Sequence, residues 1–170
     1  NSVKIIDDFK SLNSPVFVKK NNLQNTNNVF IYSHNQIYSF DSSSLNHQII
    51  YTTKNKINDI FKDIETNIIW VSTNKGLIKL TKNDGSIITI NLPKEIPNPI
   101  FSIVQDSNET IWVTYKSNEI YSYSKSGIWK RFEFKDKKCH FGNLSVNKKN
   151  IIISSDIGVF KIENNKLTKI

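Results

Sequence analysis

Apolar and polar residues follow a pattern that recurs along the chain about every 40 residues. A large apolar residue stands at the same place in each copy, namely Phe30, Trp70, Trp112 and Ile152. The intervals between successive members are 40, 42 and 40 residues. Such even spacing indicates a structural repeat, and a period of about 20 to 50 residues constrains the whole fold.

Each copy is built from the same kinds of segment. The second segment is apolar on both faces, as in IIWVST at 68–73, which predicts a strand buried between neighbouring layers. The third alternates apolar and polar residues, as in GLIKL at 76–80, which indicates a strand with one wetter face. Short polar turns separate these segments from a first and a fourth strand. No stretch has a sustained helical period, so we expect essentially no helix.

Four antiparallel strands in each repeat are typical of the blades of a β-propeller. The sequence therefore predicts an all-β fold with four blade-like units at about 8–52, 53–92, 93–134 and 135–170, preceded by a fourth strand of another blade at 3–7. A β-sandwich also has short strands, but it does not require equivalent units. Because a fourth strand both precedes the first unit and ends the last, we expect the chain to be part of a larger propeller of about seven blades.

The tryptophans divide into two kinds. Trp70 and Trp112 recur in the apolar second strand, so we expect burial between blades rather than contact with a ligand. Trp129 lies in an outer strand beside Lys130 and Arg131, and we expect it to be partly exposed and to pack rather than bind.

The charge of the chain narrows the possible partners. The formal net charge is +8, but Arg131 is the only arginine among the 23 basic residues, and the lysines are scattered. Base recognition and two-pronged phosphate contacts favour arginine, so we do not expect a nucleic-acid partner. No stretch approaches the roughly 20 apolar residues of a membrane-spanning helix, so we expect no membrane segment.

Residues for catalysis, metals or cofactors do not stand out. Cys139 is the single cysteine, which rules out an internal disulfide, and His34, His47 and His140 fall at non-equivalent positions. We therefore expect no metal, no cofactor and no catalytic residue. The carboxylates that recur, Asp63 and Asp106, fall in turns, where hydrogen bonds to the backbone are the more economical role.

The segment IWVSTNKGLIKL resembles the repeat of two-component regulator propellers. That repeat has an acidic turn, then approximately Leu-Trp-Ile-Gly-Thr, two variable residues and Gly-Leu. The next copy keeps the acidic residue and Ile-Trp-Val but has Glu119-Ile120 in place of Gly-Leu, and both copies lack the usual glycine of the first turn. The residues that carry the resemblance are Asp63, 69–73, Gly76, Leu77, Asp106 and 111–114.

This resemblance implies a function and a location. Such propellers form the extracytoplasmic sensor regions of membrane-bound hybrid histidine kinases, which commonly sense breakdown products of polysaccharides and work as dimers. It implies a non-catalytic, ligand-sensing propeller on the periplasmic or extracellular side of the envelope, with an oligosaccharide ligand and a homodimeric arrangement. The residues themselves leave a cytoplasmic location open. They equally fit a protein-interaction scaffold in an envelope, secretion or other multi-subunit complex.

The predicted binding face consists of the turns between second and third strands, because propellers usually bind through the loops of one face. These turns are polar and basic, which suits an anionic sugar or an acidic partner surface. Solvated turns without a ligand are the plain alternative. The predicted ligand or partner residues are His34, Asn35, Asn74, Lys75, Lys116, Ser117 and Asp156.

Overall fold

The computed structural model describes most of the chain, and the structural statements below concern the described residues. These are residues 17–19, 28–41, 43–44, 46–63, 66, 68–81, 86–90, 92, 96, 99–115, 117–134, 138–147, 150–163 and 166–170. The predicted strand at 3–7 and the predicted site residue Lys116 lie outside them. Every regular element in the described part is a β-strand.

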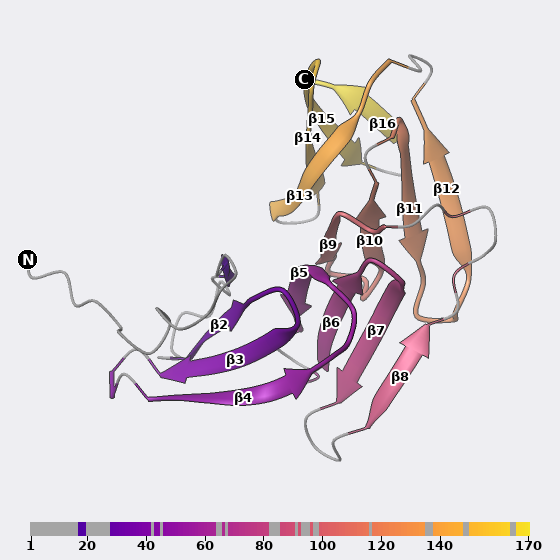
Figure 1. Ribbon diagram of the computed structural model, residues 1–170. Helices are drawn as coiled ribbons and strands as arrows, with labels where there is room; N and C mark the ends of the chain where they lie inside the picture. The colour runs from indigo at the N-terminus through magenta and orange to yellow at the C-terminus, as the bar shows by residue number, and fades with distance from the viewer. Residues whose placement is uncertain are drawn as a thin grey trace, which may run out of the picture. The chain divides into compact units, whose positions relative to one another are not determined.

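The strands form four antiparallel sheets of four strands each, and strands that follow one another in the chain are neighbours in the sheet (Figure 1). Blade 1 consists of β1 (Phe17–Lys19), β2 (Asn28–Tyr32), β3 (Gln36–Asp41) and β4 (His47–Thr52). Blade 2 consists of β5 (Ile57–Lys62), β6 (Ile68–Thr73), β7 (Gly76–Thr81) and β8 (Ile87–Ile90). Blade 3 consists of β9 (Ser102–Gln105), β10 (Ile111–Thr114), β11 (Glu119–Tyr123) and β12 (Trp129–Glu133). Blade 4 consists of β13 (Phe141–Asn147), β14 (Asn150–Ser155), β15 (Gly158–Glu163) and β16 (Lys166–Lys169). The predicted all-β arrangement of four four-stranded units is confirmed.

The chain divides into two compact units, which are described separately. Residues 1–57 form the first unit, which contains blade 1, and residues 58–170 form the second, which contains nearly all of blade 2 and the whole of blades 3 and 4. In the first unit, Phe30, Ile37 and Tyr38 are buried and lie on β2 and β3. Phe30 is the recurrent apolar position of the repeat. The strand β3 is buried from Ile37 to Phe40, on both faces, so the prediction of one wetter face from its alternation is wrong for this strand.

Burial falls from the second strand of a blade to its fourth. In blade 2, β6 is buried from Ile69 to Thr73, whereas Ile87, Ile88 and Thr89 of β8 are exposed. In blade 3, every residue of β10 is buried. A strand that is apolar on both faces therefore lies between neighbouring blades, and the outermost strand faces solvent.

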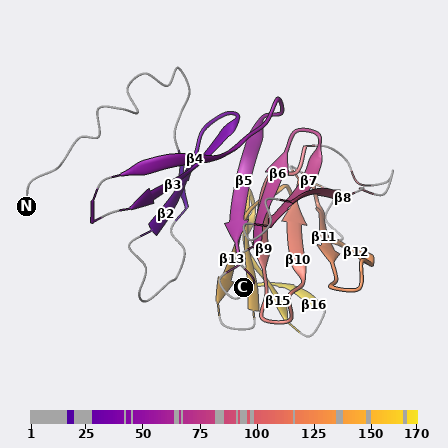
Figure 2. The ribbon, with the colours of Figure 1, turned by 90° about the horizontal axis from the view of Figure 1, so that it is seen from below.

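Successive blades of the second unit pack against one another. The strand β9 contacts β6 of the preceding blade, and β13 contacts both β9 and β10 (Figure 2). One apolar core contains Trp70, Leu77 and Ile103, and a second contains Trp112, Cys139 and Phe160. Trp70 and Trp112 are only 6% and 5% exposed, so their predicted burial between blades is confirmed.

A chain of polar contacts joins the first strands of these three blades. The buried carboxylate of Asp59 accepts hydrogen bonds from Ser102 Oγ (3.0 Å) and from the backbone N–H of Ile103 (3.1 Å). Ser102 Oγ in turn accepts a hydrogen bond from the backbone N–H of Leu144 at 3.2 Å. Since buried polar groups are costly when unpaired, these bonds fix how the three strands lie against one another.

Candidate functional site

The predicted binding face contains mostly exposed side chains. His34 and Asn35 are exposed in the turn between β2 and β3 of the first unit. In the second unit, Asn74 and Lys75 are exposed between β6 and β7, and Asp156 is exposed between β14 and β15. Ser117, between β10 and β11, is half-buried.

The backbone of two of these turns is held by the same pair of hydrogen bonds. In the first unit, the carbonyls of His34 and Asn35 accept hydrogen bonds from the N–H groups of Ile57 (2.7 Å) and Thr53 (2.9 Å). In the second unit, the carbonyls of Ser117 and Asn118 accept hydrogen bonds from the N–H groups of Phe141 (2.8 Å) and Phe134 (3.1 Å). Each turn is thus tied to the link that leads to the next blade. The backbone of both turns is held in place, and the side chains of His34 and Asn35 are exposed, whereas those of Ser117 and Asn118 are half-buried.

Asp156 is paired with a residue of the preceding blade link. Its carboxylate accepts a hydrogen bond from the backbone N–H of His140 at 2.9 Å, and its other oxygen lies 2.9 Å from His140 Nδ1. These bonds, the backbone bond first, hold the pKa of the Asp156 carboxyl below its usual value. The sequence indicated Asp156 from its turn, but nothing in it signalled that His140 would be the partner.

Beside the Ser117 turn, the charged side chains form ion pairs with one another. Arg131 forms ion pairs with Glu119 and with Glu133, the latter at 3.0 Å. The hydroxyl of Tyr121 donates to Glu119 at 2.6 Å. Burial, with this bond, raises the pKa of Tyr121 to about 12, and burial also raises the pKa of Tyr115. Both phenols are therefore neutral at physiological pH, and the only arginine is already engaged.

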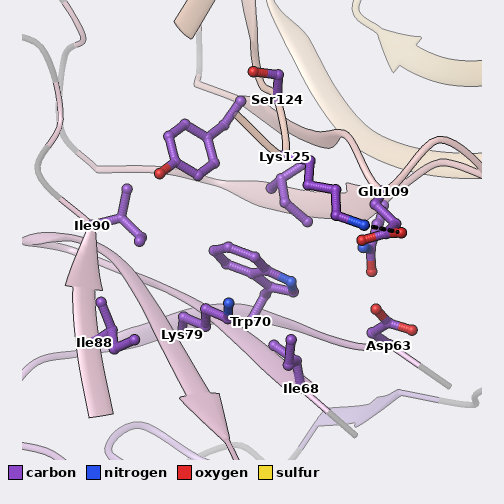
Figure 3. A pocket seen from close by; sticks show the side chains of 12 residues that line it. Asp63, Ile68, Trp70, Lys79, Ile88, Ile90, Glu109, Ser124 and Lys125 are labelled. Carbon is purple, nitrogen blue, oxygen red and sulfur yellow. Dashed lines mark hydrogen bonds and ion pairs between the residues drawn. The ribbon is translucent and has the colours of Figure 1, made fainter. Parts of the chain in front are cut away.

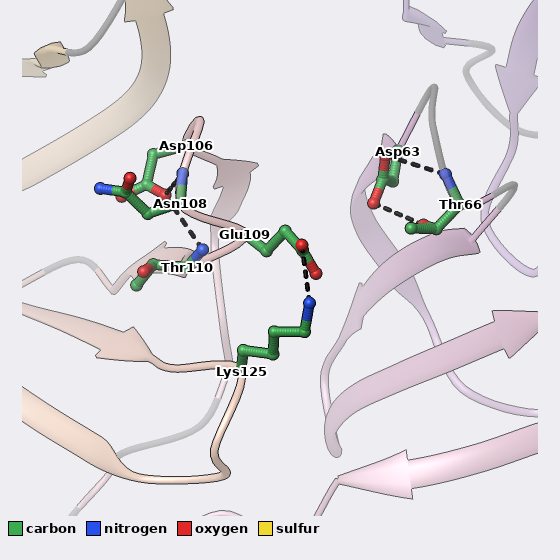
Figure 4. Close-up of polar contacts among 7 residues, drawn as sticks. All are labelled: Asp63, Thr66, Asp106, Asn108, Glu109, Thr110 and Lys125. Carbon is green, nitrogen blue, oxygen red and sulfur yellow. Dashed lines mark hydrogen bonds and ion pairs between the residues drawn. The ribbon is translucent and has the colours of Figure 1, made fainter.

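The two recurrent carboxylates lie at the opposite ends of the strands, in the turns between first and second strands (Figure 4). Asp106 accepts hydrogen bonds from the N–H groups of Asn108 (2.8 Å) and Thr110 (3.0 Å). Asp63 accepts hydrogen bonds from the backbone N–H and the hydroxyl of Thr66. Their predicted role in holding the turns is confirmed.

Glu109 occupies the place in the first turn where a glycine would be favoured. Its φ is 59°, in the left-handed region that residues with a side chain seldom adopt. Its carboxylate forms a 2.8 Å ion pair with Lys125, which lies in the turn between β11 and β12 (Figure 4). The missing glycine of the repeat is thus replaced by a strained residue whose side chain joins two turns of blade 3.

Between blades 2 and 3, on the side of these turns, there is a cavity of about 280 Å³ (Figure 3). The indole of Trp70 lies across it, and Lys79 Nζ stands 5.8 Å from the centre of the indole ring. The indole Nε1 is buried and has no hydrogen-bond partner. The cavity is lined by Asp63, Ile68, Trp70, Lys79, Ile88, Ile90, Gln105, Glu109, Ile111, Tyr123, Ser124 and Lys125. None of these was predicted as a site residue, because the predicted face lies at the other ends of the strands.

Trp129 packs as expected for an aromatic side chain of an outer strand. It is half-buried, and its ring lies 4.8 Å from that of Tyr123, centre to centre. Tyr123 meets Trp70 edge to face at 6.4 Å. An aromatic row therefore runs from the cavity to the outer strand of blade 3.

In the described part of the chain, no group of three or more His, Cys, Asp or Glu side chains is placed to hold a metal ion. Nor does that part contain a helix long and apolar enough to cross a membrane.

Successive four-stranded antiparallel sheets, each packed on the next through an apolar second strand, are blades of a β-propeller. No protein-family model matches the sequence, and no curated protein matches it. Solved β-propellers are similar in fold. One is the extracellular domain of a protein described as a hybrid two-component system from B. thetaiotaomicron, with a TM-score of 0.66 and 20% identity over 87% of this chain and 21% of that one.

Two further similar structures are enzymes. A streptogramin B lyase has a TM-score of 0.71 and 16% identity over 92% of this chain and 58% of the lyase. A catalytically inactive virginiamycin B lyase from Staphylococcus aureus, solved with quinupristin, has a TM-score of 0.69 and 18% identity over 91% and 59% of the two chains. At these identities the likeness concerns the fold alone, and this chain spans between about a fifth and three fifths of the proteins it matches.

Proposed function

We propose that this chain is a non-catalytic part of a β-propeller that senses a ligand or binds a protein, resembling the extracytoplasmic sensor region of a two-component regulatory system. The observation that carries the proposal is the construction of the predicted face. In the first unit, the turn at His34 and Asn35 has a backbone held by hydrogen bonds and exposed side chains. In the second unit, the backbone of the turn at Ser117 is held in the same way, and the side chains of Asn74 and Lys75 are exposed in the turn between β6 and β7. Rigid loops that present polar side chains are the usual binding elements of such scaffolds.

A periplasmic or extracellular location agrees with the fold of an extracellular domain among the similar structures. We propose further propeller blades in the same protein, since the chain spans 21% of that domain. We also propose a homodimer, as the motif at 69–80 implies.

A non-catalytic role is favoured over an enzymatic one by the state of the recurrent carboxylates. Asp63 and Asp106 accept hydrogen bonds within their own turns, and Asp106 also accepts one from Trp112. A general acid or base must instead be able to reach a substrate proton. The two lyases share the fold, but their activity does not transfer on fold likeness alone.

We propose an oligosaccharide as the ligand of the predicted face. Lys75 and Asn74 are exposed in the second unit and provide hydrogen-bond donors for sugar hydroxyl or acidic groups. The test is a glycan-binding screen of the protein and of its Lys75→Gln variant, with Lys166→Gln on the outer strand β16 as the matched control. Binding should weaken about fivefold or more in the first variant and stay constant in the second. Equal binding by all three proteins would refute this face assignment.

A protein-binding scaffold is the second candidate, and exposed apolar residues favour it. Ile49, Ile87, Ile88, Ile128 and Val159 are between 42% and 66% exposed. Ile87 and Ile88 lie together on β8, an outer strand whose four residues carry no charge. Such an edge is open to pairing with another strand. An Ile87→Lys variant should lose a partner or dimer that sedimentation detects for the original protein, while glycan binding stays unchanged.

A further inference from the structure

The tryptophans at equivalent positions in blades 2 and 3, Trp70 and Trp112, have different surroundings. In blade 3, Trp112 Nε1 donates a hydrogen bond to Asp106 at 2.8 Å. The ring of Phe132 covers the indole, with 5.0 Å between ring centres. Trp112 therefore has both an acceptor for its N–H and an aromatic ring against its face. Blade 3 supplies both from its own residues.

Trp70 stands at the same place in blade 2, but its own blade supplies neither an acceptor nor a covering ring, and its ring contact is the edge-to-face one with Tyr123 of blade 3. Strand pairing puts Ile90 of β8 opposite Leu77, just as Phe132 of β12 is opposite Ile120, so the smaller Ile90 replaces the phenyl ring. Trp70 is seven residues after Asp63, whereas Trp112 is six residues after Asp106. The Asp63 carboxylate bonds to Thr66 in its own turn. The result is a cavity and a buried indole N–H without an acceptor.

The polar groups around the cavity indicate which charge a ligand would carry. The two acids at its rim are engaged, Asp63 by Thr66 and Glu109 by Lys125. Among the donors beside the cavity are the indole N–H of Trp70, which has no acceptor, and the ammonium group of Lys79, which lies over the same ring (Figure 3). Gln105, Ser124 and Lys125 also line the cavity with donor groups. A buried donor without an acceptor is unfavourable, so a ligand that brings an acceptor oxygen gains by binding there. An acceptor beside an ammonium group is best negatively charged.

The size and walls of the cavity define the rest of the ligand. The apolar side chains of Ile68, Ile88 and Ile90 surround the indole, so the body of the ligand must be apolar. A volume of about 280 Å³ corresponds to about nine water-sized groups at about 30 Å³ each. That is the size of a benzene ring with a short acidic side chain. A second negative charge would meet the carboxylates of Asp63 and Glu109.

We propose that this cavity binds a small monocarboxylate with an aromatic or branched apolar body. The ligand carboxylate accepts the hydrogen bond of Trp70 Nε1 and pairs with Lys79, and its body takes the place that Phe132 fills in blade 3. The ligand thus supplies to Trp70 the two partners that Trp112 finds within its own blade. This site is at the opposite ends of the strands from the proposed sugar-binding face, so either proposal can fail without the other.

The test is titration of the protein with phenylacetate, followed by calorimetry and by the NMR signal of the Trp70 indole N–H. Phenylacetate should bind at one site and shift this signal downfield, while phenylacetamide and phenethylamine should bind about fivefold more weakly or not at all. Failure of phenylacetate to bind at about 10 mM, or equal binding by phenylacetamide, would overturn the proposal.

Three variants locate the site. Lys79→Gln should weaken phenylacetate binding about fivefold or more. Lys130→Gln is the matched control, since Lys130 Nζ lies 4.8 Å from the centre of the Phe132 ring, in a similar arrangement outside the cavity. Ile90→Phe should abolish binding by filling the cavity as Phe132 does, and its thermal unfolding shows that the fold is kept. An equal effect of Lys79→Gln and Lys130→Gln, or full binding by a folded Ile90→Phe protein, would place the ligand elsewhere and refute the assignment.

Discussion

Replacing Asp106 by Ala removes a carboxylate that serves the turn and the core of blade 3 together. It accepts hydrogen bonds from Asn108 N at 2.8 Å, Thr110 N at 3.0 Å and Trp112 Nε1 at 2.8 Å. Without it, the indole N–H of Trp112, a side chain only 5% exposed, is left with no acceptor. The turn also loses the two bonds that close it, although its N–H groups can turn to water.

The expected loss of stability follows from these three bonds. An orphaned buried N–H costs about 1–3 kcal/mol, and each bond of the more exposed turn contributes about 0.5–1 kcal/mol. The Asp106→Ala variant should therefore be less stable by about 2–5 kcal/mol. With a urea dependence of about 2 kcal/mol per molar, the unfolding midpoint should fall by about 1–2.5 M.

A double-mutant cycle separates the indole bond from the turn. Trp112→Phe removes the N–H donor, so in the Asp106→Ala background it should cost about 1–2 kcal/mol less than in the original protein. The control is Trp70→Phe, because the indole N–H of Trp70 has no acceptor to lose. Urea unfolding followed by circular dichroism measures all the variants. Additive effects of Asp106→Ala and Trp112→Phe, within about 0.5 kcal/mol, would refute the role given to this bond.

Three further perturbations test other parts of the structure. Glu109→Gly should be more stable than Glu109→Ala by about 1 kcal/mol in urea unfolding, because both lose the Lys125 pair but only glycine relieves the left-handed backbone; the reverse order would contradict the assigned φ. His140→Ala should raise the lowered pKa of Asp156 only part of the way to its ordinary value, because the bond from the backbone N–H, which the variant keeps, is the larger cause of the lowering; NMR titration measures this pKa. The Asp156 carboxylate stabilises the protein above an unfolded pKa of about 3.9, and this contribution is lost as pH falls through the lower pKa of the folded state. Asp59→Ala should cost about 2–4 kcal/mol in urea unfolding, since the N–H of Ile103 and the hydroxyl of Ser102 lose their acceptor, and a loss below about 0.5 kcal/mol would show that the contact between first strands is not stabilising.

The fold was predictable because residues close together in the sequence determine each four-stranded unit, and the same pattern recurs along the chain. The double-sided apolar character of β6 and β10 predicted their burial between blades. The alternation in β3, β7 and β11 located these strands, but it did not predict that both of their faces would be largely buried. The turn role of Asp106 was equally local, since its backbone partners lie two and four residues away. Each of these features depends on residues within one blade, so one copy of the pattern supports the prediction made from another.

The contacts that build the candidate sites are long-range, and the sequence carries no such signal for them. His140 and Asp156 are 16 residues apart, and Asp59 and Ser102 are 43 apart. Both pairs meet only because one blade packs against the next or a link folds back over a turn. The sequence located the exposed turns, but it could not tell that their carbonyl groups are occupied in holding the blade links.

The cavity was missed for a different reason, which bears on how repeats should be searched for binding sites. A repeat pattern describes what the copies share, and Trp70 matches it as well as Trp112 does. The cavity arises from what the copies do not share, namely Ile90 in the place of Phe132 and one more residue between the acidic turn and the tryptophan. Each difference looks minor in the sequence, since either residue suits an outer strand. Together they remove both partners of one buried indole, so a shared residue whose neighbours differ is a better guide to a site than a variable residue alone.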